Sequence, residues 1–312
     1  MSIKAYLKKI GRGSKGASDL SRAEANELFA EVLSSSTSGL EVGAFCMAMR
    51  LKGETAEELS GFYDALKPLL PTLTLSRPLW LLPSYNGARK TMLLTPLLAK
   101  LLADKGYCVL VHGAHEEPQR TSSEQIFTAL GWPIAKTWHD LTRLLEHQAL
   151  VYCPLSVLCP ALSRLLAVRQ VIGVRNSGHV LAKLLNPVQS QSFQINHYTH
   201  PAYPAILEEF YKNFSQNVVT MRGHEGEPVA SPSRLPELHL RFQGLDTSIV
   251  TSPEYFTELP RDAHSIDLAT TVSCYQKILS QQNPLPSHLL AQVNALLKAY
   301  GTTTATARAT HS

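Results

Sequence analysis

The residues best suited to bind a charged ligand lie in one loop, between an apolar run at residues 79–82 and a helical run at residues 96–104. The loop contains the adjacent cations Arg89 and Lys90, and it ends at Thr95, whose type and position suit a helix N-cap. Cationic side chains, free backbone amides and a helix dipole would converge there, which is the chemistry of a phosphate site. The alternative interpretation is a surface turn with two solvated charges.

Further basic residues gather in stretches that contain no acidic residue, at residues 1–18, 65–103 and 147–207. Lysine and arginine side chains that displace counterions from backbone phosphates supply most of the affinity in sequence-independent nucleic-acid binding. A net charge of +4 does not by itself indicate such a partner, and separate solvated faces are the alternative. The candidate nucleic-acid-binding residues are Lys8, Lys9, Arg12, Lys15, Arg89, Lys90, Arg164, Arg169, Arg175 and Lys183.

The sequence contains no recognisable arrangement for general acid–base or nucleophilic catalysis. His112 ends an apolar strand and has no identifiable carboxylate partner, so we assign it a structural role. Ser122 stands three residues before Gln125, which predicts a helix capping box rather than a nucleophile. We therefore assign no catalytic residue and no cofactor.

The cysteines and histidines form no metal-binding pattern, because neither a Cys-x-x-Cys pair nor a His-x-x-x-His pattern occurs. We assign no metal site. An odd number of cysteines in apolar surroundings predicts reduced, mostly buried thiols at Cys46, Cys108, Cys153, Cys159 and Cys274. No apolar run is long enough to indicate a membrane span or a signal peptide, so we expect a cytoplasmic protein that does not bind membranes.

The apolar pattern predicts helices up to about residue 67 and alternating strands and helices after residue 78. Ser21 and Glu24 form a capping box at the start of the first of these helices. The predicted strands are 79–82, 107–112, 150–152, 193–197 and 217–221, and the predicted later helices are 96–104, 123–130, 139–146, 204–214, 267–280 and 286–299. This alternation predicts an α/β domain with a mostly parallel central sheet. The Thr- and Ala-rich tail at 301–312 is expected to be disordered.

Several segments match one known family in its own order. The segments Met47-Ala48-Met49-Arg50 and Lys52-Gly53-Glu54-Thr55 are the most specific, and residues 106–113 and 169–187 follow them. On these segments the chain resembles the anthranilate phosphoribosyltransferases and pyrimidine nucleoside phosphorylases of glycosyltransferase family 3. The resemblance implies a helical domain at residues 1–75, completed by a segment near 160–190, and an α/β domain at 76–300. It also implies a homodimer that forms through the helical domain.

The residues that bind phosphoribosyl pyrophosphate in this family are missing. The family's Gly-Thr-Gly-Gly-Asp-Gly loop is replaced by residues 83–91, which keep one glycine and no aspartate. The family's His-Gly-Asn-Arg becomes His-Gly-Ala-His at residues 112–115. The adjacent acids that bind magnesium are absent, although Glu225 and Glu227 lie near their position and could serve. These departures imply that phosphoribosyl transfer has been lost.

The segments Tyr85-Asn86-Gly87-Ala88-Arg89-Lys90 and Ile10-Gly11-Arg12-Gly13 instead resemble the YbiB-like branch of this fold. That resemblance implies a homodimer that binds DNA without sequence preference through positively charged grooves, with RNA as a further candidate partner. Family position also suggests an ancestral anion-binding role for Arg169 and a structural role for Arg175. Two other interpretations stay open: a glycosyl or phosphoribosyl transferase with an altered donor site, and a protein-interaction module.

Overall fold

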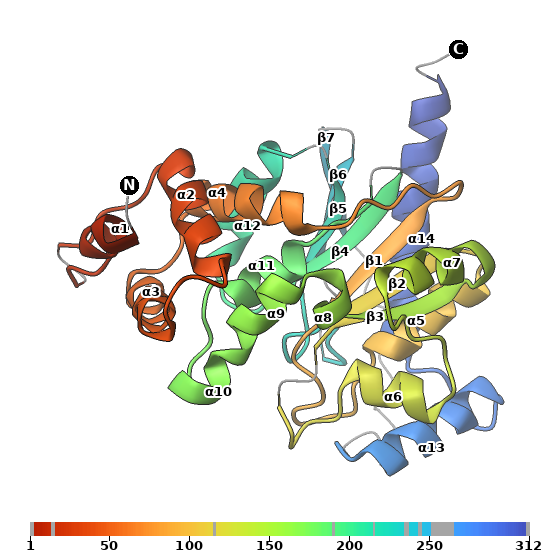
Figure 1. Ribbon diagram of the computed structural model, residues 1–312. Helices are drawn as coiled ribbons and strands as arrows, with labels where there is room; N and C mark the ends of the chain where they lie inside the picture. Colours follow the sequence, from red (N-terminus) through yellow and green to blue (C-terminus); the bar gives the residue numbers. More distant parts are fainter. Residues whose placement is uncertain are drawn as a thin grey trace. The chain divides into compact units, whose positions relative to one another are not determined.

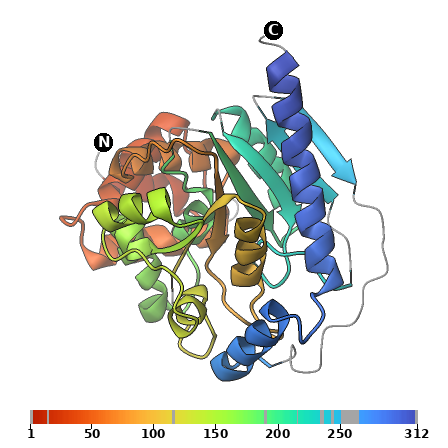
Figure 2. The same ribbon diagram turned by 90° about the vertical axis from the view of Figure 1, so that its right-hand side faces the viewer.

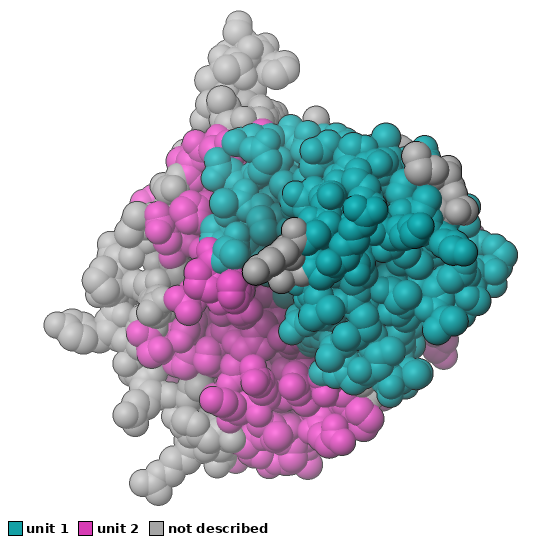
Figure 3. All heavy atoms as spheres, turned by 90° about the vertical axis from the view of Figure 1, so that its left-hand side faces the viewer, with its two compact units in different colours: residues 1–73, 155–187, 202–214 teal, residues 74–154, 188–201, 215–312 magenta. Residues whose placement is uncertain are grey.

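The structure is a computed structural model that describes residues 3–13, 16–114, 117–188, 191–214, 216–233, 237–242, 245–250 and 265–309. The chain divides into two compact units, which Figure 3 shows in different colours. Unit 1 comprises residues 1–73, 155–187 and 202–214, and unit 2 comprises residues 74–154, 188–201 and 215–312. Three separate stretches of the chain therefore contribute to each unit.

Unit 1 is built from helices (Figure 1). They are α1 Ile3–Ile10, α2 Arg22–Leu33, α3 Gly39–Lys52, α4 Ala56–Leu66, the 3-10 helix η1 Lys67–Leu69, α8 Leu155–Leu158, α9 Pro160–Ala167, α10 Arg169–Ile172, α11 Gly178–Leu184 and α12 Tyr203–Lys212. Capping boxes begin α2, α3 and α4, each with a glutamate three residues after a Ser or Thr cap. The capping box predicted for Ser21 and Glu24 is confirmed.

Helices α2 and α4 pack closely around aromatic side chains. The ring centroids of Phe29 on α2 and Phe62 on α4 are 4.7 Å apart, and Phe45 of α3 lies 5.8 Å from each. Gly61 permits this approach, because a Cβ atom at this position would lie 2.2 Å from the carbonyl oxygen of Arg22. The spacing between the two helices therefore depends on a residue without a side chain.

Substitution of Gly61 by alanine should lower the free energy of unfolding by about 1–3 kcal/mol, since the helices must separate to admit the methyl group. Gly43→Ala within α3 is the matched control, because a Cβ atom there meets nothing within 4 Å. The control should raise stability by up to about 1 kcal/mol through helix propensity. Urea titrations measure both changes, and equal stability of the two variants would contradict the packing argument.

Helix α12 differs from the sequence-based expectation in its domain. The α/β domain was predicted to include residues 204–214, but the structure places 202–214 in unit 1. The physical reason is an aromatic contact with α4: the ring centroid of Tyr63 lies 5.5 Å from that of Phe210 and 4.9 Å from that of Phe214. A helical pattern in the sequence does not reveal which core its apolar face will join.

The described part of unit 2 contains a seven-stranded sheet in the order β3-β2-β1-β4-β5-β6-β7. The parallel strands are β1 Leu79–Ser84, β2 Cys108–Gly113, β3 Leu150–Pro154, β4 Ser192–Tyr198 and β5 Asn217–Arg222. Strands β6 Glu237–Phe242 and β7 Leu245–Val250 add an antiparallel pair that the sequence patterns did not predict. The predicted fold class, a helical domain with an α/β domain around a mostly parallel sheet, is confirmed.

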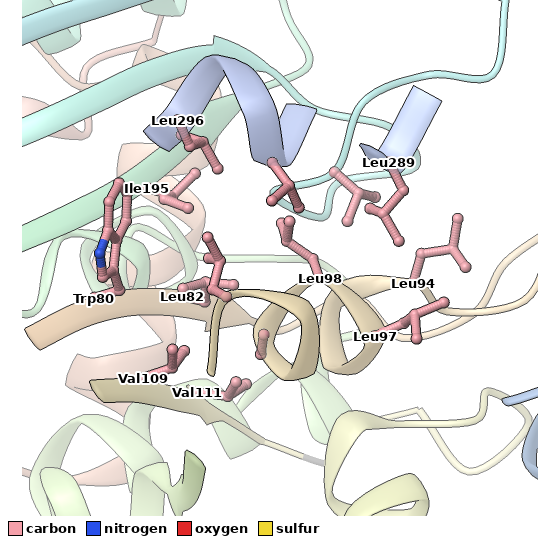
Figure 4. Packing of buried hydrophobic residues seen from close by; sticks show 14 of the residues in the cluster. Trp80, Leu82, Leu94, Leu97, Leu98, Val109, Val111, Ile195, Leu289 and Leu296 are labelled. Carbon is pink, nitrogen blue, oxygen red and sulfur yellow. The ribbon is translucent and has the colours of Figure 1, made fainter. Parts of the chain in front are cut away.

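The helices of unit 2 are α5 Thr95–Asp104, α6 Ser123–Ala129, α7 Trp138–His147, α13 Leu268–Leu279 and α14 Ser287–Ala309. All residues of β1 are buried, as expected for a parallel strand that is covered on both faces. Trp80 and Leu82 of β1 join Leu98 of α5 and Leu296 of α14 in one apolar cluster (Figure 4). Figure 2 shows α14 lying along the sheet. This core fixes the strands whose ends carry the candidate site.

The end of the chain also differs from the expectation, which was disorder from residue 301. Helix α14 instead continues to Ala309 (Figure 1), and only residues 310–312 of the tail lie outside the description. Alanines at 305, 307 and 309 have the highest helix propensity, and no proline interrupts the run. A helix already nucleated against the core can propagate through such a segment.

All five cysteines are buried and free, which confirms the prediction of reduced, buried thiols. Burial raises the pKa of the Cys46 thiol to about 11 and that of Cys153 to about 12. Thiols with so little thiolate at neutral pH are poor nucleophiles. Among the described residues, no helix has the length and apolarity needed to cross a membrane.

Candidate nucleic-acid interface

The candidate site lies at the carboxyl edge of the parallel strands in unit 2, where open α/β sheets bind their ligands. Strand β1 leads into residues 85–91, called here the β1 loop, and β5 leads into the turn at residues 224–227, called here the β5 turn. Strand β4 lies between β1 and β5. Hydrogen bonds nevertheless join the β1 loop directly to the β5 turn.

Glu227 of the β5 turn holds the first half of the β1 loop. One carboxylate oxygen accepts the backbone N–H groups of Asn86 and Gly87, at 2.7 and 3.1 Å. The other oxygen accepts the hydroxyl of Thr95, at 2.7 Å. Glu227 is buried, and loss of hydration raises the pKa of its carboxyl group even though these donors act in the opposite direction.

Thr95 therefore does not act as the N-cap that its position suggests. Helix α5 begins after Leu94, which makes no side-chain cap, and Thr95 is its first residue. The threonine hydroxyl donates to Glu227 instead. The predicted cap is wrong because a buried carboxylate, supplied by a segment far along the chain, competes for the hydroxyl group.

Glu225 holds the second half of the β1 loop. A single oxygen of its carboxylate accepts the consecutive backbone N–H groups of Arg89, Lys90 and Thr91, at 3.2, 2.9 and 3.5 Å. Successive N–H groups that converge on one point form a concave anion-binding site, often called a nest. The Glu225 side chain is only 13% exposed, so the carboxylate occupies this nest as a bound anion would.

The β5 turn has the backbone needed to present Glu225. The N–H of Glu227 donates to the carbonyl of His224 at 3.0 Å, and Glu225 and Gly226 both have positive φ, at 52° and 85°. These are the features of a type I′ turn, whose central positions favour Gly, Asn and Asp. A glutamate in the left-handed region costs on the order of 1 kcal/mol. The contacts of the Glu225 carboxylate offset that cost.

The β1 loop and the β5 turn fit each other tightly. The side-chain amide of Asn86 donates to the carbonyl of Glu225 at 2.8 Å. A Cβ atom on Gly226 would lie 1.4 Å from the Asn86 side-chain nitrogen and would displace this amide, and the positive φ of 85° also favours glycine. His197 of β4 donates to the Gly226 carbonyl at 2.6 Å. These contacts fix the backbone of the β5 turn relative to the loop.

The sequence predicted free backbone amides and two available cations in the β1 loop, and the structure contradicts the first part of this prediction. The backbone amides expected to be free are occupied by Glu225 and Glu227, so they do not offer donors to a ligand. The two carboxylates suggested as magnesium ligands are themselves engaged by N–H donors. The side chains of Arg89 and Lys90 remain exposed and have no hydrogen-bonding or ionic partner in the part of the chain that the structure describes.

His112 has the structural environment that the sequence suggests. Its side chain is fully buried, and Nδ1 is hydrogen-bonded to the Tyr85 hydroxyl at 2.8 Å. Burial lowers the pKa of the imidazole to about 3. The ring is therefore neutral at physiological pH and connects β2 to the β1 loop.

The basic residues of α1 and of the segment that follows it separate into two groups. Lys8 and Arg12 are exposed, and neither has a hydrogen-bonding or ionic partner among the described residues. Lys4 precedes Lys8 by one helical turn and is exposed in the same way, although the candidate set omitted it. Lys9 is instead paired with Glu24 of α2, at 2.7 Å. Lys15 lies outside the described residues.

The candidates after α8 are less available than the sequence suggests. Arg164 is exposed, although its guanidinium also donates to the Leu33 carbonyl at 3.3 Å. Arg169, Arg175 and Lys183 are half-buried, and each already has an interaction partner. Among the candidates that the structure describes, four therefore stay exposed with no partner in the described part of the chain: Lys8 and Arg12 in unit 1, and Arg89 and Lys90 in unit 2.

Unit 1 also carries an apolar groove of about 320 Å³ between α1 and α3. Leu7 and Ile10 line it from α1, and Met47 and Leu51 line it from α3. Leu51 is 73% exposed, and Leu40 at the start of α3 is 85% exposed. The groove and Leu51 therefore expose apolar surface on this part of unit 1.

Comparison with known proteins identifies relatives along the whole chain. The chain is 36% identical over 310 residues to the uncharacterized protein YbiB of Escherichia coli strain K12, which covers 96% of this chain and 95% of that protein. It is 30% identical over 171 residues to the anthranilate phosphoribosyltransferase of Anaeromyxobacter dehalogenans strain 2CP-C, which covers 54% of this chain and 51% of that enzyme. Residues 4–67 match the helical bundle domain of the glycosyl transferase family.

Solved structures of similar fold cover nearly the whole chain. Anthranilate phosphoribosyltransferase from Thermus thermophilus superposes with a TM-score of 0.75 at 18% identity, over 97% of this chain and 90% of that one. The Saccharomyces cerevisiae enzyme in complex with PRPP and Mg gives a TM-score of 0.73 at 14% identity, over 97% and 93%. At these identities the likeness concerns the fold alone. The chain therefore belongs to the family of YbiB, and it has the anthranilate phosphoribosyltransferase fold with the helical bundle of the glycosyl transferase family.

Proposed function

We propose that the protein is a non-enzymatic homodimer that binds DNA, and also RNA, without sequence preference through exposed basic side chains. The observation that carries the proposal is the state of the β1 loop. Its backbone amides are occupied by internal carboxylates, whereas the cations Arg89 and Lys90 are exposed and uncommitted among the described residues. Such cations bind backbone phosphates by counterion release, and they do not distinguish one sequence from another.

Occupation of the β1 loop also supports the loss of phosphoribosyl transfer. A relative of the same fold has been solved in complex with PRPP and Mg. By resemblance, the β1 loop of this chain stands where that family holds the pyrophosphate. Here Glu225 and Glu227 occupy the donors, and no other acid is adjacent to them in the β5 turn. A pyrophosphate that used all of these donors would have to displace both carboxylates and would meet like charges nearby.

The homodimer is supported by the apolar groove between α1 and α3. In a monomer, Leu51 would leave the apolar groove open to water, and Leu40 would be exposed on the same helix α3. Association of two copies through unit 1 would cover it and would bring two sets of Lys4, Lys8 and Arg12 into one particle. Duplication of the basic set would raise affinity for a polyanion through multivalency.

The test is binding of the purified protein to labelled oligonucleotides of unrelated sequence, single- and double-stranded, at about 50 to 500 mM salt. We expect comparable affinities for all sequences and a linear fall of log affinity with log salt, with a slope of about −0.9 per neutralised phosphate on duplex DNA. Sedimentation of the same samples should give a dimer. No binding at the lowest salt, or binding to one sequence alone, would refute the proposal.

A further inference from the structure

The three consecutive amides that Glu225 occupies have the properties of an anion site. The N–H groups of Arg89, Lys90 and Thr91 converge on one oxygen, and two cationic side chains belong to the same residues. This combination of nest and cations suits a phosphate group, which carries more charge and more acceptor oxygens than a carboxylate. The occupant is nevertheless part of the protein.

The two carboxylates at the β1 loop differ in how firmly they are held. Glu227 is fully buried and serves donors from two segments, Asn86-Gly87 and Thr95. Glu225 contacts the amides of residues 89–91, keeps 13% of its side chain exposed, and comes from a turn position with unfavourable φ. Glu227 is therefore part of the core of the site, whereas Glu225 is a peripheral and separable occupant.

We propose that Glu225 is an internal anion that closes a phosphate-binding nest at residues 89–91 and thereby excludes free phosphate compounds from it. Binding of an external phosphate requires the Glu225 side chain to leave the nest. The apparent affinity is therefore the affinity of the open nest multiplied by the fraction of molecules in which the nest is open. Removal of the side chain should open the nest without new contacts. The proposal concerns inorganic and small phosphates, and it does not depend on nucleic-acid binding.

Three substitutions of Glu225 separate occupation of the nest from charge. Glycine and asparagine both tolerate the left-handed turn position. Glycine has no side chain, and the asparagine side chain is one methylene too short to place its oxygen where the Glu225 carboxylate lies. Glu225→Gln keeps the length of the side chain and one acceptor oxygen. All three remove the same negative charge, so any difference between them reports whether the nest is filled.

The experiment is a titration of the full chain with inorganic pyrophosphate. Calorimetry measures the affinity, and the backbone amide NMR signals of Arg89, Lys90 and Thr91 report where the pyrophosphate binds. We expect the Gly and Asn variants to bind at least about tenfold more tightly than the Gln variant and the wild type, with shifts at these amides. Melting temperatures verify that each variant is folded. If the Gly variant is unstable, the Asn variant alone is compared with the Gln variant and the wild type.

Three outcomes overturn the proposal. The first is pyrophosphate binding by the wild type with shifts at the same amides, because the nest would then be open. The second is equal affinity of the Gln, Gly and Asn variants, because charge alone would explain the gain. The third is failure of the folded Glu225→Gly and Glu225→Asn variants to bind pyrophosphate, because the three amides would then not form a phosphate site.

Discussion

Reversal of the charges of Arg89 and Lys90 should weaken DNA binding by roughly 100-fold at about 50 mM salt. Each cation lost from a duplex contact removes about 0.9 from the magnitude of the salt slope, so two lost contacts remove about 1.8, which is on the order of 100-fold in affinity between about 50 mM and 1 M salt. The substitutions Arg89→Glu and Lys90→Glu leave the backbone amides in place, and neither side chain has a folded-state partner among the described residues. The loss should therefore appear in binding and not in the melting temperature.

Lys105 offers a matched control for the single variant Lys90→Glu. Both lysines are exposed residues of unit 2, but Lys105 follows α5 and precedes β2, at the amino edge of the parallel sheet. Lys105→Glu changes the net charge by the same amount and should leave the salt slope within error of the wild type. Equal losses from the two substitutions would show that net charge matters and that the carboxyl edge does not. An unchanged slope for the double variant would remove Arg89 and Lys90 from the interface.

Local patterns in the sequence were sufficient for the parallel strands and most helices. The uninterrupted apolar run at 79–82 predicts a strand buried on both faces, which is β1. The Ser122–Gln125 capping box is likewise confirmed at the start of α6. Strand β6 alternates exposed and buried residues over only a short stretch, and β7 pairs with β6 at the end of the described sheet. Such an antiparallel edge gives a weaker signal than an apolar run.

The occupants of the β1 loop could not be predicted, because their contacts join residues more than 130 positions apart. Those contacts require β5 to lie two strands from β1 in the sheet, which residue order does not supply. A partial signal exists in Glu225-Gly226, since a two-residue turn usually begins with Asn, Asp or Gly. A glutamate at such a position indicates a side chain that is held by something else.

The available basic residues were only partly predictable for a similar reason. Lys8 and Lys9 are adjacent residues of the same type, and in the sequence only their positions relative to the apolar face of the helix distinguish them. Ile3, Tyr6 and Ile10 are the buried face of α1, and Lys8 lies away from that face. Lys9 lies closer to it and reaches Glu24, whose position depends on how α1 packs on α2. Period predicts exposure, but it does not predict a partner on another helix.

Removal of the Glu227 side chain should cost at least about 3 kcal/mol of unfolding free energy. Glu227→Ala leaves the N–H groups of Asn86 and Gly87 and the hydroxyl of Thr95 without their acceptor, and each such group costs about 1–3 kcal/mol when it stays buried. Glu227→Gln keeps the shape and one acceptor oxygen, so its cost should be much smaller. Glu146→Ala, at an exposed position of α7, is the control for loss of a carboxylate and should be nearly neutral.

The raised pKa of Glu227 predicts how the stability difference between the wild type and Glu227→Gln changes with pH. Burial makes the folded carboxyl group hold its proton more strongly than the unfolded one, whose ordinary value is 4.5. The folded state then binds more protons, so the contribution of Glu227 is fully present below about pH 4.5 and declines as pH rises through the folded pKa. Glu227→Gln cannot titrate. The stability of the wild type relative to this variant should therefore fall in denaturant titrations as pH rises above about 4.5, the ordinary value of the carboxyl group. A difference that grows with pH would mean that the amide donors outweigh burial and that the carboxylate is stabilised in its charged form.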